Sequence, residues 1–382
     1  MTKKLLSALL CFFLLLPALI PVCYAEEALP FDLNCRSAVL MEAETGRILY
    51  EKNADEALPP ASVTKIMTLL IIMEAIDGGA LGWDDTVTAS AHATSMGGSQ
   101  IFLKEGEQMS VRDMVKSVVI ASANDAAVAL AEHICGSESA FVARMNARAA
   151  ELGMKNTVFE NTNGLDDSTE NHVTSARDIA IMSRELIRHK EILEFSSTWM
   201  DTVRDGAFGL TNTNRLVRFY NGCTGLKTGS TAKAKFCISA TAERDGMSLI
   251  AVIMASPTRD ERNAAAKTLL DWGYANYSLF RPSIELPSSL PVIGGKNDSC
   301  KITVESVCTV VPKGSDKRIV STVELPEKVF SPLDEGAEVG CIKFTLDGKE
   351  IARSGIKTAE TVEKTNYFDV LCDILTYFLL KK

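Results

Sequence analysis

Ser62 and Lys65 are the residues whose types and spacing allow covalent chemistry. They stand three positions apart at the start of 62–76, an almost wholly apolar stretch that Gly78-Gly79 ends, which predicts a buried helix. Helical residues at i and i+3 share one face, and burial favours the neutral form of a lysine. A neutral amine beside a serine hydroxyl is a general base for a nucleophile. Taken alone, the motif favours a non-catalytic alternative, in which the serine begins a helix and the lysine side chain reaches solvent.

Two further motifs follow in order and change that balance. Ser122-Ala123-Asn124 stands just before a helical stretch, 126–134, where a hydroxyl and an amide can face a cleft. Lys227-Thr228-Gly229 stands just before two strands, where a lysine and a threonine can bind the anionic end of a substrate. Singly, these motifs predict no more than a helix cap and a surface turn. The three together are the set found in penicillin-binding proteins and class A β-lactamases.

The chain resembles the secreted D-alanyl-D-alanine carboxypeptidases, which are the low-molecular-mass penicillin-binding proteins. The resemblance runs from about residue 33 to residue 277 and continues more weakly to the C-terminus. Besides the three motifs, it is carried by the segments 38–46, 58–62, 98–106, 124–133, 163–165 and 226–229.

The resemblance implies a role for each motif residue. Ser62 would be the nucleophile that forms an acyl-enzyme, Lys65 its general base, and Ser122 a proton relay to the leaving D-alanine. Asn124 would hold the substrate amide, and the backbone N–H groups of Ser62 and Ser230 would form the oxyanion hole. The substrate-binding positions would be Asn124, Lys227, Thr228, Gly229 and Ser230, with Lys227 and Thr228 on the terminal carboxylate. Which group takes the first proton stays open, because Lys65, Ser122 and Lys227 would titrate together.

Three positions near these motifs are less easily interpreted. Thr224 stands where many relatives carry aspartate, and Lys235 stands where glycine is common, so both leave substrate preference open. His172 lies in a segment that the family shares, and we expect it to be structural.

The remaining pattern predicts the fold. Strands are expected at 37–41, 47–50, 235–242 and 249–255, mainly helical structure over 111–195, and a closing helix at 263–274. The resemblance implies a mixed α/β serine transpeptidase/β-lactamase-like catalytic domain over 26–280, an antiparallel sheet flanked by helices with a helical subdomain. Short alternating segments at 301–311, 318–323 and 338–346 predict a small all-β, β-sandwich-like domain over 281–362.

The two ends of the chain predict its location. Residues 1–25 have the pattern of a secretory signal peptide cut after Ala25, the alternative being an uncleaved anchor helix. Residues 363–382 contain an apolar helical stripe of Tyr367, Val370, Leu371, Ile374, Leu375 and Phe378. This predicts an amphipathic helix on the outer face of the cytoplasmic membrane, or one docked on its own β domain. We therefore expect an exported protein, peripheral on that face.

The expected function is removal of the terminal D-alanine from peptidoglycan stem peptides ending in D-Ala-D-Ala, without metal or cofactor. β-Lactam antibiotics would be covalent inhibitors. Lys+Arg 40 against Asp+Glu 49, with no basic block, argues against a nucleic-acid partner. One alternative is a β-lactamase. Those enzymes usually carry a glutamate in an E-x-x-x-N arrangement after the second motif, but four positions after Glu160 this sequence has Gly164 and not asparagine. The other is a catalytically silent wall-binding protein.

Overall fold

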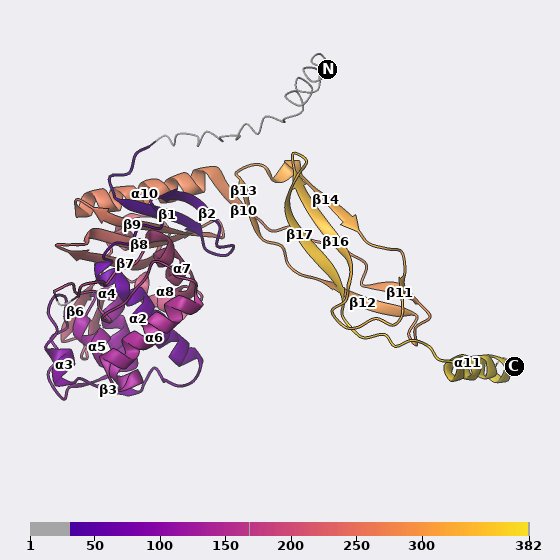
Figure 1. Ribbon diagram of the computed structural model, residues 1–382, viewed down its shortest axis with the longest axis horizontal. Coiled ribbons are helices and arrows are strands. Elements are labelled where there is room, and N and C mark those ends of the chain that lie inside the picture. The colour runs from indigo at the N-terminus through magenta and orange to yellow at the C-terminus, as the bar shows by residue number, and fades with distance from the viewer. Residues whose placement is uncertain (1–30, 168, 381–382) are drawn as a thin grey trace, which may run out of the picture. The chain divides into compact units, whose positions relative to one another are not determined.

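The computed structural model describes residues 31–167 and 169–380. Two compact units are distinguished, Met1–Leu33 and Asn34–Lys382, and every helix and strand described belongs to the second unit (Figure 1). The predicted signal peptide, with its cleavage point after Ala25, lies outside the described residues.

A five-stranded antiparallel sheet is the centre of the N-terminal part of this unit. In the order β2-β1-β9-β8-β7, its strands are Ile48–Lys52, Ser37–Glu42, Met247–Ser256, Lys235–Arg244 and Cys223–Thr231. The first four contain the strands predicted from the sequence. Asp245 and Gly246, at φ 51° and 72°, form the predicted two-residue turn between β8 and β9, because both central positions of such a turn need a positive φ.

Both faces of this sheet are covered, which explains why β1 is buried at all six residues. Leu40 and Leu249 face α10 (Arg259–Asn276), where a Cβ on Gly273 would lie only 2.9 and 2.7 Å from their side chains. Val39 and Val252 are paired across the strands and belong to the main core on the opposite face. Figure 1 shows the sheet with α10 on one side and helices such as α2, α4 and α5 on the other.

The helix predicted over 62–76 is divided at its start. A 3-10 turn, η1 (Ala61–Thr64), contains Ser62, and α2 (Lys65–Asp77) begins at Lys65. Ala61, the first residue of η1, has a φ of 50°, so a right-handed helix cannot extend through it toward the N-terminus. Ten residues of α2 are buried, so that its apolar surface packs on every side, as predicted.

Further elements surround α2. The remaining helices of this N-terminal part are α3 (Ala91–Thr94), α4 (Val111–Ile120), α5 (Asn124–Cys135), α6 (Glu138–Glu151), α7 (Ala176–Leu186), α8 (Glu191–Ser196) and α9 (Leu216–Phe219). Two small antiparallel sheets consist of β3 (Thr86–Thr88) with β4 (Gln108–Ser110), and of β5 (Met200–Val203) with β6 (Phe208–Thr211). The predicted mainly helical stretch 111–195 therefore holds five helices but is interrupted by irregular chain at 152–175.

The C-terminal part is all β, as predicted, apart from a 3-10 turn and a last helix. β10 (Tyr277–Phe280) pairs with β13 (Thr309–Pro312). Six strands form a second sheet in the order β14 (Ile319–Glu324), β16 (Glu338–Leu346), β17 (Lys349–Thr358), β12 (Ser299–Val304), β11 (Ser289–Ile293) and β15 (Val329–Phe330), with η2 (Asp316–Arg318) before β14. The single segment predicted at 301–311 is thus two strands in different sheets.

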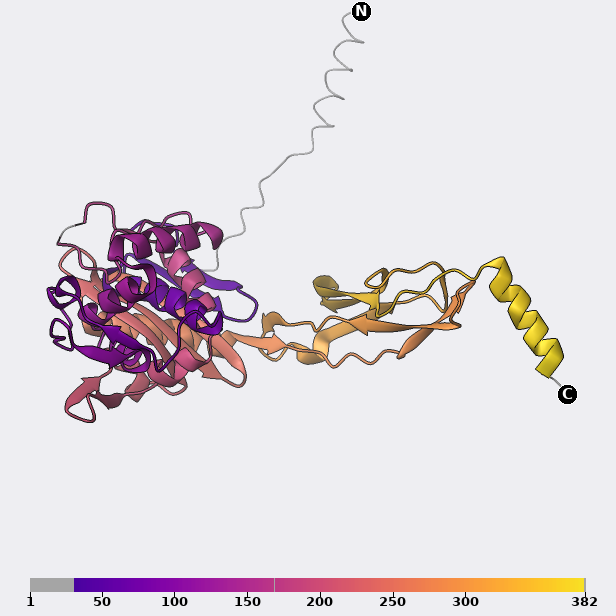
Figure 2. The ribbon, with the colours of Figure 1, turned by 90° about the horizontal axis from the view of Figure 1, so that it is seen from below.

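The last helix, α11 (Tyr367–Leu380), is drawn in yellow in Figures 1 and 2 and coincides with the predicted tail helix. None of the helices within 31–167 and 169–380 has the length and apolar character needed to cross a membrane.

Candidate active site

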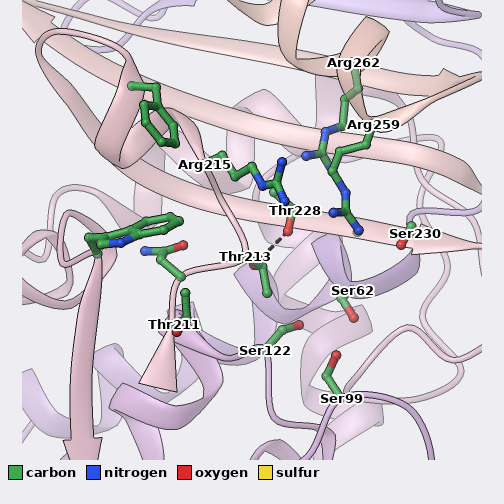
Figure 3. Close-up of a pocket in the computed structure, with 14 residues that line it drawn as sticks. Ser62, Ser99, Ser122, Thr211, Thr213, Arg215, Thr228, Ser230, Arg259 and Arg262 are labelled. Atoms are coloured by element: carbon green, nitrogen blue, oxygen red, sulfur yellow. Dashed lines mark hydrogen bonds between the residues drawn. The ribbon is translucent and has the colours of Figure 1, made fainter. Parts of the chain in front are cut away.

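The eight predicted site residues come together at one pocket of about 610 Å³ (Figure 3). Ser62, Ser122, Thr228, Gly229 and Ser230 line it, and Lys65, Asn124 and Lys227 are bonded directly behind them. They come from η1 and α2, from the junction of α4 and α5, and from β7. The chain thus brings three distant motifs into one constellation.

Lys65 is fully buried and has three acceptors around its Nζ atom. These are Ser62 Oγ at 2.9 Å, Asn124 Oδ1 at 2.5 Å and the Asn163 carbonyl oxygen at 2.7 Å. Burial first, and then the charge of Lys227, hold the pKa of Lys65 well below 10.5, while Asp125 acts in the opposite direction. The predicted buried lysine beside Ser62 is confirmed in its geometry.

Asn163 belongs to one of the segments that carry the resemblance, and the contact of its carbonyl with Lys65 is not predicted by the sequence. The carbonyl reaches Lys65 because Gly164, at φ 84°, lets the chain pass against η1. A Cβ on Gly164 would lie 1.8 Å from the Ala61 carbonyl oxygen, so no other residue fits this approach.

Ser122 and Lys227 form a second buried pair. Lys227 Nζ donates to Ser122 Oγ at 2.8 Å and to the Thr228 carbonyl at 3.0 Å. Burial, followed by the charge of Arg262, lowers the pKa of Lys227 from 10.5 to about 7. Ser122 has a φ of 63°, a conformation that is costly for a residue with a side chain and that aims the hydroxyl at Lys227.

Lys227-Thr228-Gly229 lies inside β7 rather than in a turn before the strands, which corrects its predicted position. β7 is the edge strand of the sheet, and it passes so close to η1 that a Cβ on Gly229 would lie 2.7 Å from the Pro60 carbonyl and 2.9 Å from Ser62 N. Gly229 therefore places the backbone of Ser230 beside that of Ser62. Thr228 Oγ1 donates to Thr213 Oγ1 at 2.8 Å.

Asn124 links Lys65 to the loop at 97–106. Its Nδ2 donates to the Gly97 carbonyl at 2.7 Å, and its backbone N–H donates to the Ser99 carbonyl at 2.7 Å. The neighbouring Asp125 is buried and accepts hydrogen bonds from the backbone N–H groups of Ile101 and Leu103. Asn124 is thus held through both its side chain and its backbone.

Three arginines of the pocket wall were not predicted. Arg215 precedes α9, while Arg259 and Arg262 belong to α10, so no sequence spacing connects them (Figure 3). Burial, and then the charges of Arg259 and Arg215, lower the pKa of Arg262 to about 10. The wall holds no aspartate or glutamate. The pocket therefore suits an anionic ligand.

The less easily interpreted residues lie apart from the pocket wall. His172 is buried with Nε2 at 2.7 Å from Thr64 Oγ1, and its Nδ1 accepts the Glu160 N–H at 2.9 Å. Burial lowers the pKa of His172 to about 4, so it serves as a neutral structural link, as expected. Thr224 Oγ1 donates to Thr241 Oγ1 of β8, and Lys235 is exposed opposite Thr231.

Comparison with known proteins agrees with this geometry. A family model described as D-alanyl-D-alanine carboxypeptidase matches residues 24–258, which is more than half of the chain. The chain belongs to this carboxypeptidase family. A second model, described as penicillin-binding protein 5, C-terminal domain, matches residues 279–364.

Similar proteins cover nearly the whole carboxypeptidase. The D-alanyl-D-alanine carboxypeptidase DacF of Bacillus subtilis is 41% identical over 381 residues, with 97% of each chain covered. The structure of penicillin-binding protein 5 from Haemophilus influenzae has a TM-score of 0.78 at 33% identity and covers 88% of this chain and 100% of that chain. Penicillin-binding protein 6B from Escherichia coli gives a TM-score of 0.72 at 31% identity, with 87% and 97% covered.

The protein is therefore a serine-type D-alanyl-D-alanine carboxypeptidase with a mixed α/β catalytic domain and an all-β C-terminal domain. Its family acts on peptidoglycan peptides ending in D-Ala-D-Ala, and covalent penicillin binding is typical of it. The position of Glu160 argues against the β-lactamase alternative. Glu160 is exposed, and its carboxylate accepts the backbone N–H groups of Glu170 and Asn171 within its own loop.

We predict that Gly164→Ala lowers kcat/KM of the carboxypeptidase by at least about 100-fold. The added methyl group would collide with backbone, so η1 and the Asn163 carbonyl must separate, and misplacement by about 1 Å costs about that much. D-Alanine release from a D-Ala-D-Ala peptide measures the loss.

Gly153→Ala is the matched control, because Gly153 also has a positive φ, 73°, but open space around its Cβ position. It should cost about 1 kcal/mol of stability and leave kcat/KM within about twofold. Equal losses in both variants would mean that backbone strain, and not the approach to η1, causes the effect.

Proposed function

We propose that Ser62 is the nucleophile of this carboxypeptidase and that Lys65 is its general base. The observation that carries this assignment is the set of atoms around Lys65 Nζ. Asn124 Oδ1 and the Asn163 carbonyl oxygen are acceptors only, and they engage two hydrogens of the amine. When Lys65 is neutral, its lone pair is left to face the Ser62 hydroxyl and to accept its proton.

The acyl-enzyme forms when Ser62 Oγ attacks the carbonyl carbon of the penultimate D-alanine. The backbone N–H groups of Ser62 and Ser230 would bind the oxygen that becomes negative. The proximity of β7 and η1 at Gly229 supports this pair of donors, because it brings the two backbones side by side. Water then hydrolyses the ester and releases the shortened stem peptide.

Lys227 and Ser122 would act on the leaving residue. Lys227 carries the charge that attracts the terminal carboxylate, and Thr228 lies beside it on the pocket wall. Ser122 Oγ accepts from Lys227 Nζ, so a proton can pass through this hydroxyl to the departing amine of D-alanine. Asn124 would bind the substrate amide through its remaining hydrogen, while Gly229 and Ser230 present β7 to the peptide.

We further propose that the mature protein starts after residue 25, with its catalytic domain at 26–280 and its β domain at 281–362. Residues 363–382 would hold it on the outer face of the cytoplasmic membrane. α11 leaves nine large apolar side chains at least 39% exposed, among them Tyr367, Leu375 and Phe378. Such a surface favours an interfacial position for a helix too short to span a bilayer.

Ser62→Ala should abolish the covalent penicillin adduct. Among the three atoms hydrogen-bonded to Lys65 Nζ, only Ser62 Oγ is a hydroxyl that can act as a nucleophile. Intact-mass spectrometry after incubation with penicillin measures the adduct. Ser354→Ala is the control, since Ser354 also starts an S-x-x-K sequence but donates to the Glu305 carbonyl in the β domain. An adduct retained in Ser62→Ala contradicts the assignment.

Lys227→Gln should lower kcat/KM for a peptide with a free terminal carboxylate by about 10- to 150-fold. A charge-assisted contact of about 1.5–3 kcal/mol is lost. Because the pKa of Lys227 is lowered to about 7, its ammonium form dominates at pH 6 and its amine form at pH 8. The wild-type kcat/KM should therefore fall as the pH rises through about 7, and a pH series measures this limb.

A C-terminally amidated peptide is the control for Lys227, since it offers no carboxylate. The kcat/KM for this amidated peptide should not fall as the pH rises through about 7. Lys227→Gln should also lower it less than it lowers kcat/KM for the peptide with a free carboxylate. If kcat/KM falls with pH in the same way for both peptides, and Lys227→Gln lowers both equally, Lys227 acts in proton transfer or stability and not in carboxylate binding.

Removal of residues 365–382 should release the enzyme from membranes into the soluble fraction, with activity on a soluble peptide within about twofold of wild type. Each apolar side chain contributes about 1.5–3 kcal/mol at full burial, and less at an interface, so several of them support reversible attachment. Fractionation of the expressing cells measures the release. A truncated chain that stays with membranes points to an uncleaved leader, and one that loses activity points to a helix docked in the fold.

A further inference from the structure

The pocket extends past the groups that the proposed reaction uses. Ser62, Ser122 and Thr228 account for one end, and the wall continues through Thr213 to Thr211 (Figure 3). A volume of about 610 Å³ is in the range of roughly 300–1,000 Å³ that holds whole drug-sized ligands. D-Alanine, with a methyl side chain, leaves the far end of this space empty.

The charge of the wall also exceeds what a single carboxylate needs. Besides Lys227, which lies behind the wall, the wall itself contains Arg215, Arg259 and Arg262 and no acidic residue. Arg262 donates to Asn263 Oδ1 and to the Cys237 carbonyl, which are neutral acceptors. Burial first, and then the charges of Arg259 and Arg215, lower the pKa of Arg262, and Asp260 offsets only part of the repulsion from these arginines. A ligand with a second negative charge would relieve this repulsion.

Trp199 and Phe219 complete the far end. Their rings meet edge to face at 6.2 Å, and Phe219 is 63% exposed, so it offers apolar surface to a chain of methylene groups. The Nε1–H of Trp199 is buried and has no hydrogen-bond partner. A buried donor without an acceptor is costly, and a ligand oxygen would satisfy it.

We propose that this end of the pocket accepts a leaving residue larger than alanine, namely a D-amino acid whose side chain ends in a carboxylate. This rests on the proposed function and extends its substrate class. The α-carboxylate stays with Lys227 and Thr228, the methylene groups lie along Phe219, and the side-chain carboxylate reaches Arg215 and the N–H of Trp199.

The chemical step is unchanged. Ser62 Oγ bonds to the D-alanyl carbonyl carbon, the amide C–N bond to the leaving D-residue breaks, and the proton of Ser62 ends on the departing amine. Water then adds to the ester carbonyl, and the serine leaves with a proton from that water.

Three peptides test the proposal on the full-length enzyme: diacetyl-L-Lys-D-Ala followed by D-Ala, D-Gln or D-Glu. D-Gln matches D-Glu in size and lacks its charge. We expect kcat/KM for the D-Glu peptide to exceed that for the D-Gln peptide by about fivefold or more. A D-Gln peptide cleaved equally well or better overturns the proposal.

Two variants locate the effect. Arg215→Gln should reduce the D-Glu to D-Gln ratio to near one, and Trp199→Phe, which keeps the ring but removes the N–H, should lower it about twofold. Arg218→Gln is the matched control, because Arg218 is on α9 and stacks over Trp199 and Phe219 but does not line the pocket. An equal fall in Arg218→Gln would show a general effect of charge and overturn the site.

Failure of the two proposals can be told apart. If the D-Ala peptide is not cleaved, or is cleaved equally fast by Ser62→Ala, the assignment of the catalytic residues fails. If D-alanine release requires Ser62 but kcat/KM for the D-Glu peptide does not exceed that for the D-Gln peptide, only the proposal of the extended leaving-group site fails.

Discussion

The burial of the Lys65 amine is the constraint on which the rest of the site depends. A lysine at zero exposure must either lose its proton or have every hydrogen bonded, and here three acceptors permit both states. The acceptors come from η1, α5 and the irregular chain near Gly164. Each of these segments must therefore be fixed against α2, which explains why the apolar side chains of α2 are part of the main core.

The two buried lysines differ in how far their pKa values are lowered, although burial is the first cause for both. The pKa of Lys65 is lowered well below its ordinary value, in part by Lys227, whereas the pKa of Lys227 stops at about 7. The lowered pKa favours the neutral amine at Lys65, whereas Lys227 carries its charge below about pH 7 and loses it above. The two are linked, since a proton on Lys227 makes a proton on Lys65 more costly. A substrate carboxylate that stabilises the charged Lys227 would offset part of that repulsion.

The parts of this structure that repeat or alternate could be predicted from the sequence, and the parts made by close approach could not. The strands around Asp245-Gly246, the apolar helix after Lys65 and the tail helix follow from periodicity and turn chemistry. The contact of the Asn163 carbonyl with Lys65 has no such signal, because any residue has a carbonyl. Gly164 is plain in the sequence, but the collision that requires a glycine there depends on Ala61, 103 positions earlier in the chain.

The arginines show why the net charge of the chain did not reveal its ligand. The formal charge of −9 describes the whole surface, and at physiological salt exposed charges act only over about 8 Å. Recognition of an anion is therefore decided at the pocket, where three arginines line the wall, Lys227 lies behind it and no carboxylate is among the lining residues. These residues come from β7, α10 and the chain before α9, so the cationic site exists only after folding. An acidic protein can in this way bind an acidic peptide, since the local arrangement of charge outweighs the total.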